Sequence, residues 1–168
     1  MRAGRDERAR VRGAQRGSAS DLEALFRTYW PRAFRAAYLV THDAGAAEDI
    51  AQESFLAAIR ALDRFDRRRP FGPWLHRIVV NRAIDWTRAR KLRGEVELVD
   101  SVPAPETAPA GGETLAALAR LSPEHRAVVV MRYLLEFTPG EIADALDLPR
   151  GTVNSRLRRG LDALGDEL

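Results

Sequence analysis

Arginine supplies almost all of the positive charge of this 168-residue sequence, and it is concentrated in two places. Between Arg150 and Arg159 there are four arginines and no acidic residue, within a stretch that is otherwise rich in acidic side chains. Guanidinium groups bind phosphates and guanine edges, asparagine can bind adenine, and serine binds phosphate. The segment is therefore predicted to contact duplex DNA, with a solvated basic surface as the alternative. The candidate residues are Asn154, Ser155, Arg156, Arg158 and Arg159.

The second concentration of arginine is interleaved with aromatic residues, in the segment DRFDRRRPFGPW that spans residues 63–74. Unpaired bases stack on aromatic rings while arginines neutralise phosphates, so this composition suits single-stranded nucleic acid. Polar residues then follow at helical spacing. Most aromatic side chains belong to a hydrophobic core, so the residues alone leave both interpretations open. The candidates for contact with nucleic acid are Phe65, Arg67, Arg68, Arg69, Trp74, Arg77, Asn81, Asp85 and Arg88.

A third group of residues shares one face of a predicted helix. Asp49, Gln52, Glu53 and Leu56 recur at helical spacing, opposite an apolar stripe that includes Phe55. A face of this kind can dock on another pair of helices. The pattern by itself favours an ordinary solvated surface.

Catalysis and metal binding are not expected. The sequence contains no cysteine, which excludes disulfides, thiolate metal sites and a cysteine nucleophile. The histidines His42, His76 and His125 are far apart and lack the spacing of a metal site. Paired carboxylates such as Glu48 and Asp49 have no positioned base or nucleophile beside them. We therefore predict no enzymatic activity, no metal and no cofactor.

The elements that must position these residues are helices. Across residues 18–93 the apolar residues recur with a helical period, and no alternating pattern predicts a strand. Ser20 is the expected N-cap of the first helix, and Pro31 is expected to open a second one. A third helix is expected over residues 46–62 and a fourth over residues 71–90, with a charged loop between them. These residues are predicted to form the first domain.

Residues 94–112 interrupt the helical pattern with three prolines, three glycines and four acidic residues, which predicts a flexible linker. Residues 113–168 are predicted to form a second domain of four helices. Within it, Thr138 and Glu141 have the spacing of a capping box. A short helix, a tight turn and a basic helix then follow, which is typical of a helix-turn-helix. The predicted fold class is all-α, with two small helical domains.

Residues 1–17 contain six arginines and show no apolar periodicity, so they are predicted to form a disordered basic tail. No hydrophobic run approaches the roughly 20 residues that a membrane span needs. The first residues also lack the apolar stretch of a secretory signal. The expectation is a cytoplasmic protein without membrane insertion.

Motifs in both predicted domains resemble those of a bacterial RNA polymerase sigma factor of the extracytoplasmic-function (ECF) group in the sigma-70 family. In the first domain the matching segments are LFRTYWPRAFRAAYLV, AEDIAQESFLAAIRALDRFD and RRPFGPWLHRIVVNRAIDWTRARK. In the second domain the match is LSPEHRAVVVMRYLLEFTPGEIADALDLPRGTVNSRLRRGLDAL. The resemblance covers residues 21–93 and 113–164, and this order of motifs is far more specific than a lone helix-turn-helix.

The resemblance implies a role for each surface. The face with Asp49, Gln52 and Glu53 is expected to bind the clamp of core RNA polymerase, in place of the solvated-surface interpretation. The first domain is expected to melt the minus-ten promoter element, with a flipped base captured at Phe65–Arg69 and read with the help of Asn81. The second domain is expected to read the minus-thirty-five element as duplex and to dock on the polymerase flap. Control by an anti-sigma factor is also implied.

Two features depart from the family pattern. Position 154 is often Lys or Arg in the family, so Asn154 is expected to alter one base or phosphate contact. The Arg-rich start of the chain has no counterpart that we can place. Two rival functions are a two-domain transcriptional regulator with a dimerisation or sensing domain, and a structural helical adaptor. Neither rival requires the AEDIAQESF face or the arginine–phenylalanine loop.

Overall fold

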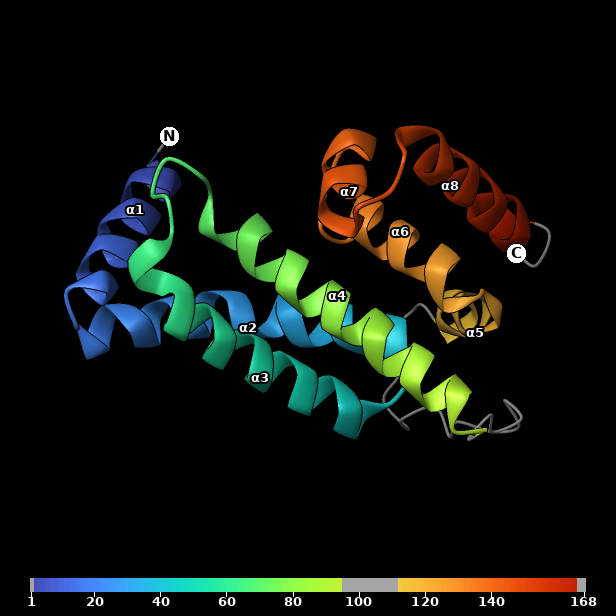
Figure 1. Cartoon of the computed structure of the whole chain (residues 1–168), viewed down its shortest axis with the longest axis horizontal. Helices are drawn as coiled ribbons and strands as arrows, with labels where there is room; N and C mark the ends of the chain where they lie inside the picture. Colours follow the sequence, from blue (N-terminus) through green and yellow to red (C-terminus); the bar gives the residue numbers. More distant parts are fainter. Residues whose placement is uncertain (1, 95–111, 166–168) are drawn as a thin grey trace.

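The computed structural model describes residues 2–94 and 112–165, which form eight α-helices and one short 3-10 helix, with no strand among them (Figure 1). The all-α prediction is confirmed for this part of the chain. The first half consists of α1 (Arg2–Gln15), α2 (Ala19–Thr41), α3 (Ala44–Ala61), the 3-10 helix η1 (Leu62–Arg64) and α4 (Phe71–Leu92). The second half consists of α5 (Gly112–Arg120), α6 (Pro123–Tyr133), α7 (Pro139–Leu146) and α8 (Arg150–Gly165). None of the described helices is both long and apolar enough to cross a bilayer.

Helix α2 is a single 23-residue element, so the prediction that Pro31 opens a second helix is wrong. Its N-cap is Ser18, whose hydroxyl accepts a hydrogen bond from the backbone N–H of Asp21. A proline inside a helix removes one backbone hydrogen bond and costs about 3 kcal/mol. Buried residues on both sides of the proline, such as Leu25 and Ala33, fix the two parts against the core and offset that cost.

Helix α1 replaces the disordered tail that was predicted for residues 1–17, so that prediction is wrong for Arg2–Gln15. The helix packs on α2 and η1. Val11 is its one large apolar residue, and it is only 2% exposed. A single apolar residue gives no periodicity that sequence analysis could detect. Ala14 also packs against the core, and polar side chains of α1 make further contacts that are described below.

The core of the first half lies among α2, α3 and α4, which run alongside one another (Figure 1). Aromatic rings pack between α2 and α3. Phe26 lies 4.9 Å from both Trp30 and Phe55, measured between ring centroids. At the start of α4, the ring of Phe71 packs against that of Tyr29. These contacts fix α3 and α4 relative to each other, and with them the loop that joins the two helices.

The second half contains the predicted helix-turn-helix, formed by α7 and α8. Thr138 and Glu141 form the predicted capping box at the start of α7. Asp147 ends this helix in the left-handed backbone conformation, with φ of 53°, and the chain turns directly into α8. Val153 and Leu157 bury one face of α8, which packs on α6 and α7.

The two halves pack against each other. Helix α6 contacts both α2 and α4, and α7 contacts α4 (Figure 1). Buried residues of the two halves form one continuous hydrophobic core cluster. The sequence pattern predicts two domains joined by a linker and gives no sign of this contact. The predicted linker over residues 94–112 lies outside the described residues, apart from its two ends.

Candidate functional site

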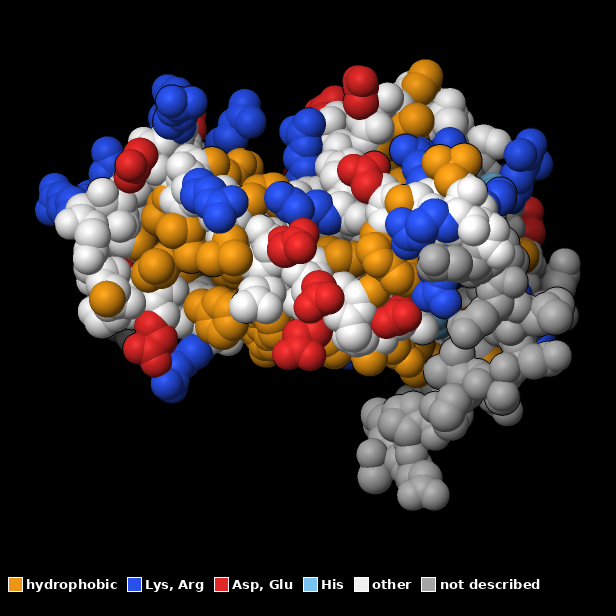
Figure 2. All heavy atoms as spheres, turned by 60° about the horizontal axis from the view of Figure 1, so that its bottom comes forward, with side chains coloured by type: hydrophobic (Ala, Val, Ile, Leu, Met, Phe, Trp, Pro, Cys, Tyr) orange, Lys and Arg blue, Asp and Glu red, His pale blue; other side chains and the backbone are white. Residues whose placement is uncertain are grey.

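The four residues predicted to share a face of α3 do lie together on its outer surface. Asp49, Gln52, Glu53 and Leu56 are all exposed, while the apolar stripe of the helix is buried on the other side. Glu53 accepts a hydrogen bond from Arg82 of α4 at 3.1 Å, between two exposed side chains. Figure 2 turns this side of the molecule forward and shows acidic side chains beside hydrophobic ones. An exposed leucine beside acidic side chains can dock on a partner whose surface is basic.

The loop between η1 and α4 exposes the predicted arginines. Arg67, Arg68 and Arg69 are all exposed. Nε of Arg68 donates to both carboxylate oxygens of Asp66, at 3.0 and 3.1 Å. These bonds, with a further one from the Arg68 backbone N–H, lower the pKa of Asp66 to about 2. The Asp66–Arg68 pair therefore stays ionised at neutral pH.

Phe65 does not lie on this exposed surface. Its side chain is 8% exposed, and its ring packs 4.5 Å from the ring of Trp74 and 5.9 Å from that of Phe71. The core interpretation is therefore correct for Phe65 and Phe71, because large apolar rings gain most from leaving water. In this conformation the Phe65 ring supports the loop from beneath and offers no free face to a base.

The outer side of α4 brings several other candidates together. A depression of about 500 Å³ is lined by Trp74, Arg77, Asn81, Arg82 and Asp85, together with Ile78. The side-chain amide of Asn81 donates to the backbone oxygen of Arg77 and, at 3.0 Å, to the backbone oxygen of Ala145 in α7. Arg88 lies further along the helix, 4.0 Å from Glu124 of α6. The candidate nucleic-acid surface of the first half is thus in direct contact with the second half.

Helix α8 places its candidate residues on one outer face. Asn154, Ser155, Arg158 and Arg159 are exposed and Arg156 is partly buried, opposite the buried stripe of the helix. Ser155, Arg156 and Arg159 also line a polar depression that reaches Arg88 of α4. The amide, hydroxyl and guanidinium groups of this face are those that recognise base edges and phosphates.

A buried arginine joins the two halves, and sequence analysis did not identify it. Arg126 of α6 is 7% exposed, and its guanidinium donates to the backbone oxygen of Val40 at 2.7 Å. It also donates to the backbone oxygens of Ala119 and Leu121. Val40 lies in the last turn of α2, where backbone carbonyls lack helical partners and the helix dipole favours a cation. Burial lowers the pKa of Arg126 to about 10, so the group remains charged at neutral pH.

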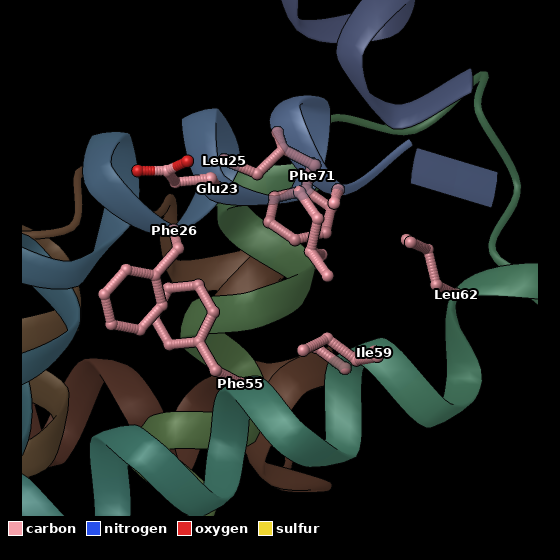
Figure 3. Close-up of a pocket in the computed structure, with 10 residues that line it drawn as sticks. Glu23, Leu25, Phe26, Phe55, Ile59, Leu62 and Phe71 are labelled. Atoms are coloured by element: carbon pink, nitrogen blue, oxygen red, sulfur yellow. The ribbon is translucent and has the colours of Figure 1, made fainter. Parts of the chain in front are cut away.

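An apolar pocket of about 270 Å³ lies between α2 and α3 (Figure 3). The rings of Phe26 and Phe55 form one side of it, and Ile59 of α3 and Leu62 of η1 form another. Glu23 is the one charged residue among those that line it. The pocket suits an apolar side chain better than a charged substrate.

Most of the candidate residues lie on exposed surfaces, and Phe65 is the exception among those predicted to contact DNA. The α3 face, the loop arginines and the α8 face are assembled as predicted, whereas Phe65 is buried. The contacts of α1 with the loop and of Arg126 with α2 were missed. No short-range pattern signals either contact, because the partners are backbone atoms far away in the sequence.

Two family models match this chain. The model described as Sigma-70 region 2 matches residues 25–93, and the model described as Sigma-70, region 4 matches residues 112–164. The first match contains α3, the arginine loop and α4, and the second contains α5–α8 as far as Leu164.

Curated relatives match over nearly the whole chain. The chain is 30% identical to the ECF RNA polymerase sigma factor SigW of Bacillus subtilis, with 95% of each protein covered. It is 34% identical to the ECF RNA polymerase sigma factor SigL of Mycobacterium tuberculosis, with 93% of each covered.

Solved structures show the same fold. CnrH, solved in complex with the cytosolic domain of CnrY, matches with a TM-score of 0.71 and 26% identity over 96% of each chain. The sigma factor RpoE of Bartonella quintana, solved with the anti-sigma factor NepR, matches with a TM-score of 0.73 and 21% identity, covering 88% of this chain and 96% of that one.

Proposed function

This chain belongs to the ECF group of sigma-70 family RNA polymerase sigma factors, which direct polymerase to promoters. We propose that separate surfaces of the chain bind core polymerase, open promoter DNA and read duplex DNA. The observation that carries the proposal is the pair of arginine-bearing surfaces, one within each family-matched region. Residues 18–93 form the unit that binds core polymerase and opens DNA. Residues 113–168 form the unit that reads duplex DNA, and residues 94–112 link them.

The outer face of α3 binds core polymerase. Asp49, Gln52 and Glu53 supply acceptors and negative charge, and Leu56 supplies an apolar anchor that is 45% exposed. Acidic side chains around an apolar contact favour a basic partner surface and exclude an acidic one. The clamp of core polymerase is the partner that the family assignment indicates.

The loop and the outer side of α4 hold the melted minus-ten element. Arg67, Arg68 and Arg69 neutralise the phosphates of the non-template strand, and the depression beside Asn81 receives an unstacked base. Trp74, Arg77 and Asp85 line the same depression, and Arg88 lies further along α4. Phe65 acts indirectly here, by supporting the loop. Unstacking a base costs a few kcal/mol, which binding to core polymerase and to the loop must offset.

The outer face of α8 reads the minus-thirty-five element in the major groove. The N-terminal half of a recognition helix reaches deepest into the groove, so Asn154, Ser155 and Arg156 are assigned to base edges. Arg158 and Arg159 lie further along and are assigned to phosphates. The same half of the chain also contacts the polymerase flap.

The conformation described above cannot read both promoter elements at once. The positions that give the two elements their names are about 25 base pairs apart. This corresponds to about 85 Å along B-DNA, at 3.4 Å per base pair. Here Asn81 of one surface is hydrogen-bonded to Ala145, just before the turn that leads into the other. Binding to polymerase must therefore separate the halves and break the Asn81–Ala145 and Arg126–Val40 hydrogen bonds.

An anti-sigma factor is the proposed regulator, and the site of action is the cytoplasm, where polymerase and promoters are found. Among the structural relatives of the chain, the sigma factor RpoE of Bartonella quintana was solved with such a partner, the anti-sigma factor NepR. A partner that binds both halves and keeps them together would prevent the opening step. The energy of its binding would shift the equilibrium between the closed and the open molecule toward the closed one.

Transcript-start mapping tests the proposed function. Core polymerase is incubated with genomic DNA fragments, with and without the full-length chain, and RNA 5′ ends are sequenced. The chain should produce starts preceded by two shared sequence elements at a fixed spacing. Arg156→Ala should relax the preference at one base pair of the upstream element, whereas Arg159→Ala should lower use of all promoters and reduce the salt dependence of binding. Identical start sites with and without the chain would refute the proposal.

A further inference from the structure

Helix α1 holds both ends of the loop that carries the exposed arginines. The loop runs from η1 to the start of α4, between residues 64 and 71. Two polar side chains of α1, Glu7 and Gln15, reach backbone groups on either side of it, 47 to 64 residues away in the sequence. These side chains join α1 to the loop backbone, in addition to the packing of α1 on α2.

Gln15 fixes the beginning of the loop. Its side-chain amide donates to the backbone oxygen of Leu62 at 2.9 Å and to that of Phe65 at 3.1 Å. Both N–H groups of one planar amide can therefore be used, and each satisfies a carbonyl beside the turn. The Leu62 oxygen also accepts the backbone N–H of Phe65, so Gln15 reinforces the turn that places the Phe65 ring beneath the loop.

Glu7 fixes the end of the loop. One oxygen of its carboxylate accepts the backbone N–H of Phe71 at 2.9 Å, and the other accepts the hydroxyl of Tyr29. Phe71 is the first residue of α4, where backbone N–H groups have no helical acceptor and a negative charge is favoured. Burial together with the bond to Glu7 raises the pKa of Tyr29, so the hydroxyl remains a donor at physiological pH.

We propose that Glu7 and Gln15 are positioning residues for promoter opening, which act by holding the arginine loop in the shape that receives the non-template strand. This inference rests on the proposed function of the loop. The two residues need not touch DNA. They would reduce the number of loop conformations that must be lost when the strand binds, and so make capture of an unstacked base faster.

The first test uses the free full-length protein and requires no promoter. Backbone hydrogen exchange is measured for Gln15→Ala, Glu7→Ala and Glu7→Gln. In the first two variants the amides of residues 65–69 and 71 should exchange at least fivefold faster, while those of α3 and the rest of α4 keep their rates. Glu7→Gln retains an oxygen acceptor for the Phe71 N–H and should stay close to the native protein.

The second test measures strand opening by the holoenzyme at a promoter found by start-site mapping. Permanganate reactivity of unpaired thymines is followed with time on fully duplex DNA and on DNA with a pre-melted bubble. Gln15→Ala and Glu7→Ala should open duplex DNA about five- to tenfold more slowly, the effect expected from one lost hydrogen bond. The pre-melted bubble should restore most of the rate, and the affinity for core polymerase should not change.

Asp6→Ala is the matched control, because it removes an exposed carboxylate from the neighbouring position of the same helix. It should behave like the native protein in both tests. Asn81→Ala is the reference variant for a direct defect in the proposed minus-ten surface, and it should slow strand opening.

Three results would overturn the inference. One is native loop exchange and native opening in Gln15→Ala and Glu7→Ala, while Asn81→Ala is slow. The second is faster exchange throughout the first half together with weaker binding to core polymerase. This would mean that α1 stabilises the whole first half and not the arginine loop specifically. The third is a defect in Asp6→Ala equal to that in Glu7→Ala. Native opening in Asn81→Ala as well would instead refute the proposed minus-ten surface.

Discussion

Glu53 gives the sharpest mutational test of the α3 face. The charge reversal Glu53→Lys removes an exposed ion pair with Arg82, and such pairs contribute at most about 1 kcal/mol to stability. The fold should therefore persist. Against a basic partner surface, the same change replaces attraction by repulsion, so the affinity for core polymerase should fall at least tenfold. Titration of fluorescently labelled chain with core polymerase measures this.

The control for that experiment is Glu23→Lys on α2. Glu23 is also exposed and also pairs with a neighbouring exposed arginine, at 2.7 Å from Arg27, but it lies outside the α3 face. Equal loss of affinity in both variants would mean that net charge, rather than this face, determines binding.

The buried side chain of His76 should make the stability of the fold depend on pH. The imidazole is 3% exposed, and burial, with a smaller contribution from Arg32, lowers its pKa to about 4 from an unfolded value of about 6.5. The unfolded chain therefore binds the proton first as the pH falls. The stability that the neutral imidazole provides is complete above pH ~6.5 and is lost progressively toward pH ~4.

The variant His76→Gln removes this titration. Between pH 7 and pH 4, the fall in the free energy of unfolding should be smaller in the variant, by about 3 kcal/mol at most. His42, whose pKa burial also lowers to about 4, still titrates in the variant, so part of the dependence remains. Urea unfolding at several pH values measures the difference, and identical pH profiles would show that His76 is not protected from protons in the folded state.

Single residues also show where sequence-based prediction reaches its limit. The exposed faces of α3 and α8 could be predicted because residues of one helix share a face at fixed spacing. Phe65 could not be placed, because an aromatic residue beside arginines fits a base-stacking surface and a core equally well. Only its contacts with Phe71 and Trp74 decide between them.

Helices α6 and α8 pack closely where Gly160 faces Val129. A Cβ atom at this position would lie 2.9 Å from a methyl group of Val129, which is buried and has little room to move. Overpacking costs about 1–3 kcal/mol, which exceeds the gain of up to about 1 kcal/mol that alanine offers within a helix. Gly160→Ala should therefore lower the free energy of unfolding.

Gly151 provides the comparison on the same helix. Nothing lies within 4 Å of a Cβ atom placed there, so Gly151→Ala should be neutral or slightly stabilising. Thermal unfolding of both variants tests the pair. A Gly160→Ala variant as stable as Gly151→Ala would mean that α6 and α8 are less tightly packed than described.

The helices differ in how well the sequence predicted them, and the reasons are local. Helices α6 and α7 begin where Ser122 and Thr138 cap them, because such caps are short-range signals. Helix α2 continues through Pro31 because tertiary packing outweighs the local cost of proline. Helix α1 has one buried apolar residue, Val11, and is held by long-range polar contacts that no local pattern encodes.

The packing of the two halves against each other has consequences for the whole molecule. The outer side of α4 is partly covered by α7, through the Asn81–Ala145 hydrogen bond. Arg126 closes the contact between α6 and the end of α2. In this closed state the proposed minus-ten surface is not free, so the isolated protein should bind promoter DNA poorly. Residues 95–111 can span at most about 60 Å when fully extended, and together with the two halves this reach allows both elements to be contacted after opening.

Energy transfer between two dyes tests this opening most directly. The chain contains no cysteine, so single cysteines can be introduced and labelled at Lys91 in α4 and Asp144 in α7, both exposed. Asp144 precedes Ala145, and Lys91 lies ten residues beyond Asn81, which is about 15 Å along a helix. The dyes should therefore lie roughly 20 Å apart in the free protein and transfer efficiently. A control pair at Ser20 and Lys91, both in the first half, reports any change that does not involve separation of the halves.

When core polymerase is added until all of the chain is bound, transfer between positions 91 and 144 should fall nearly to zero, and transfer in the control pair should not change. Promoter DNA added to the free protein should have little effect, because DNA alone does not provide the binding energy of polymerase. Efficient transfer that persists in the complete complex of chain, core polymerase and promoter would contradict the proposal that polymerase opens this closed molecule to read two promoter elements.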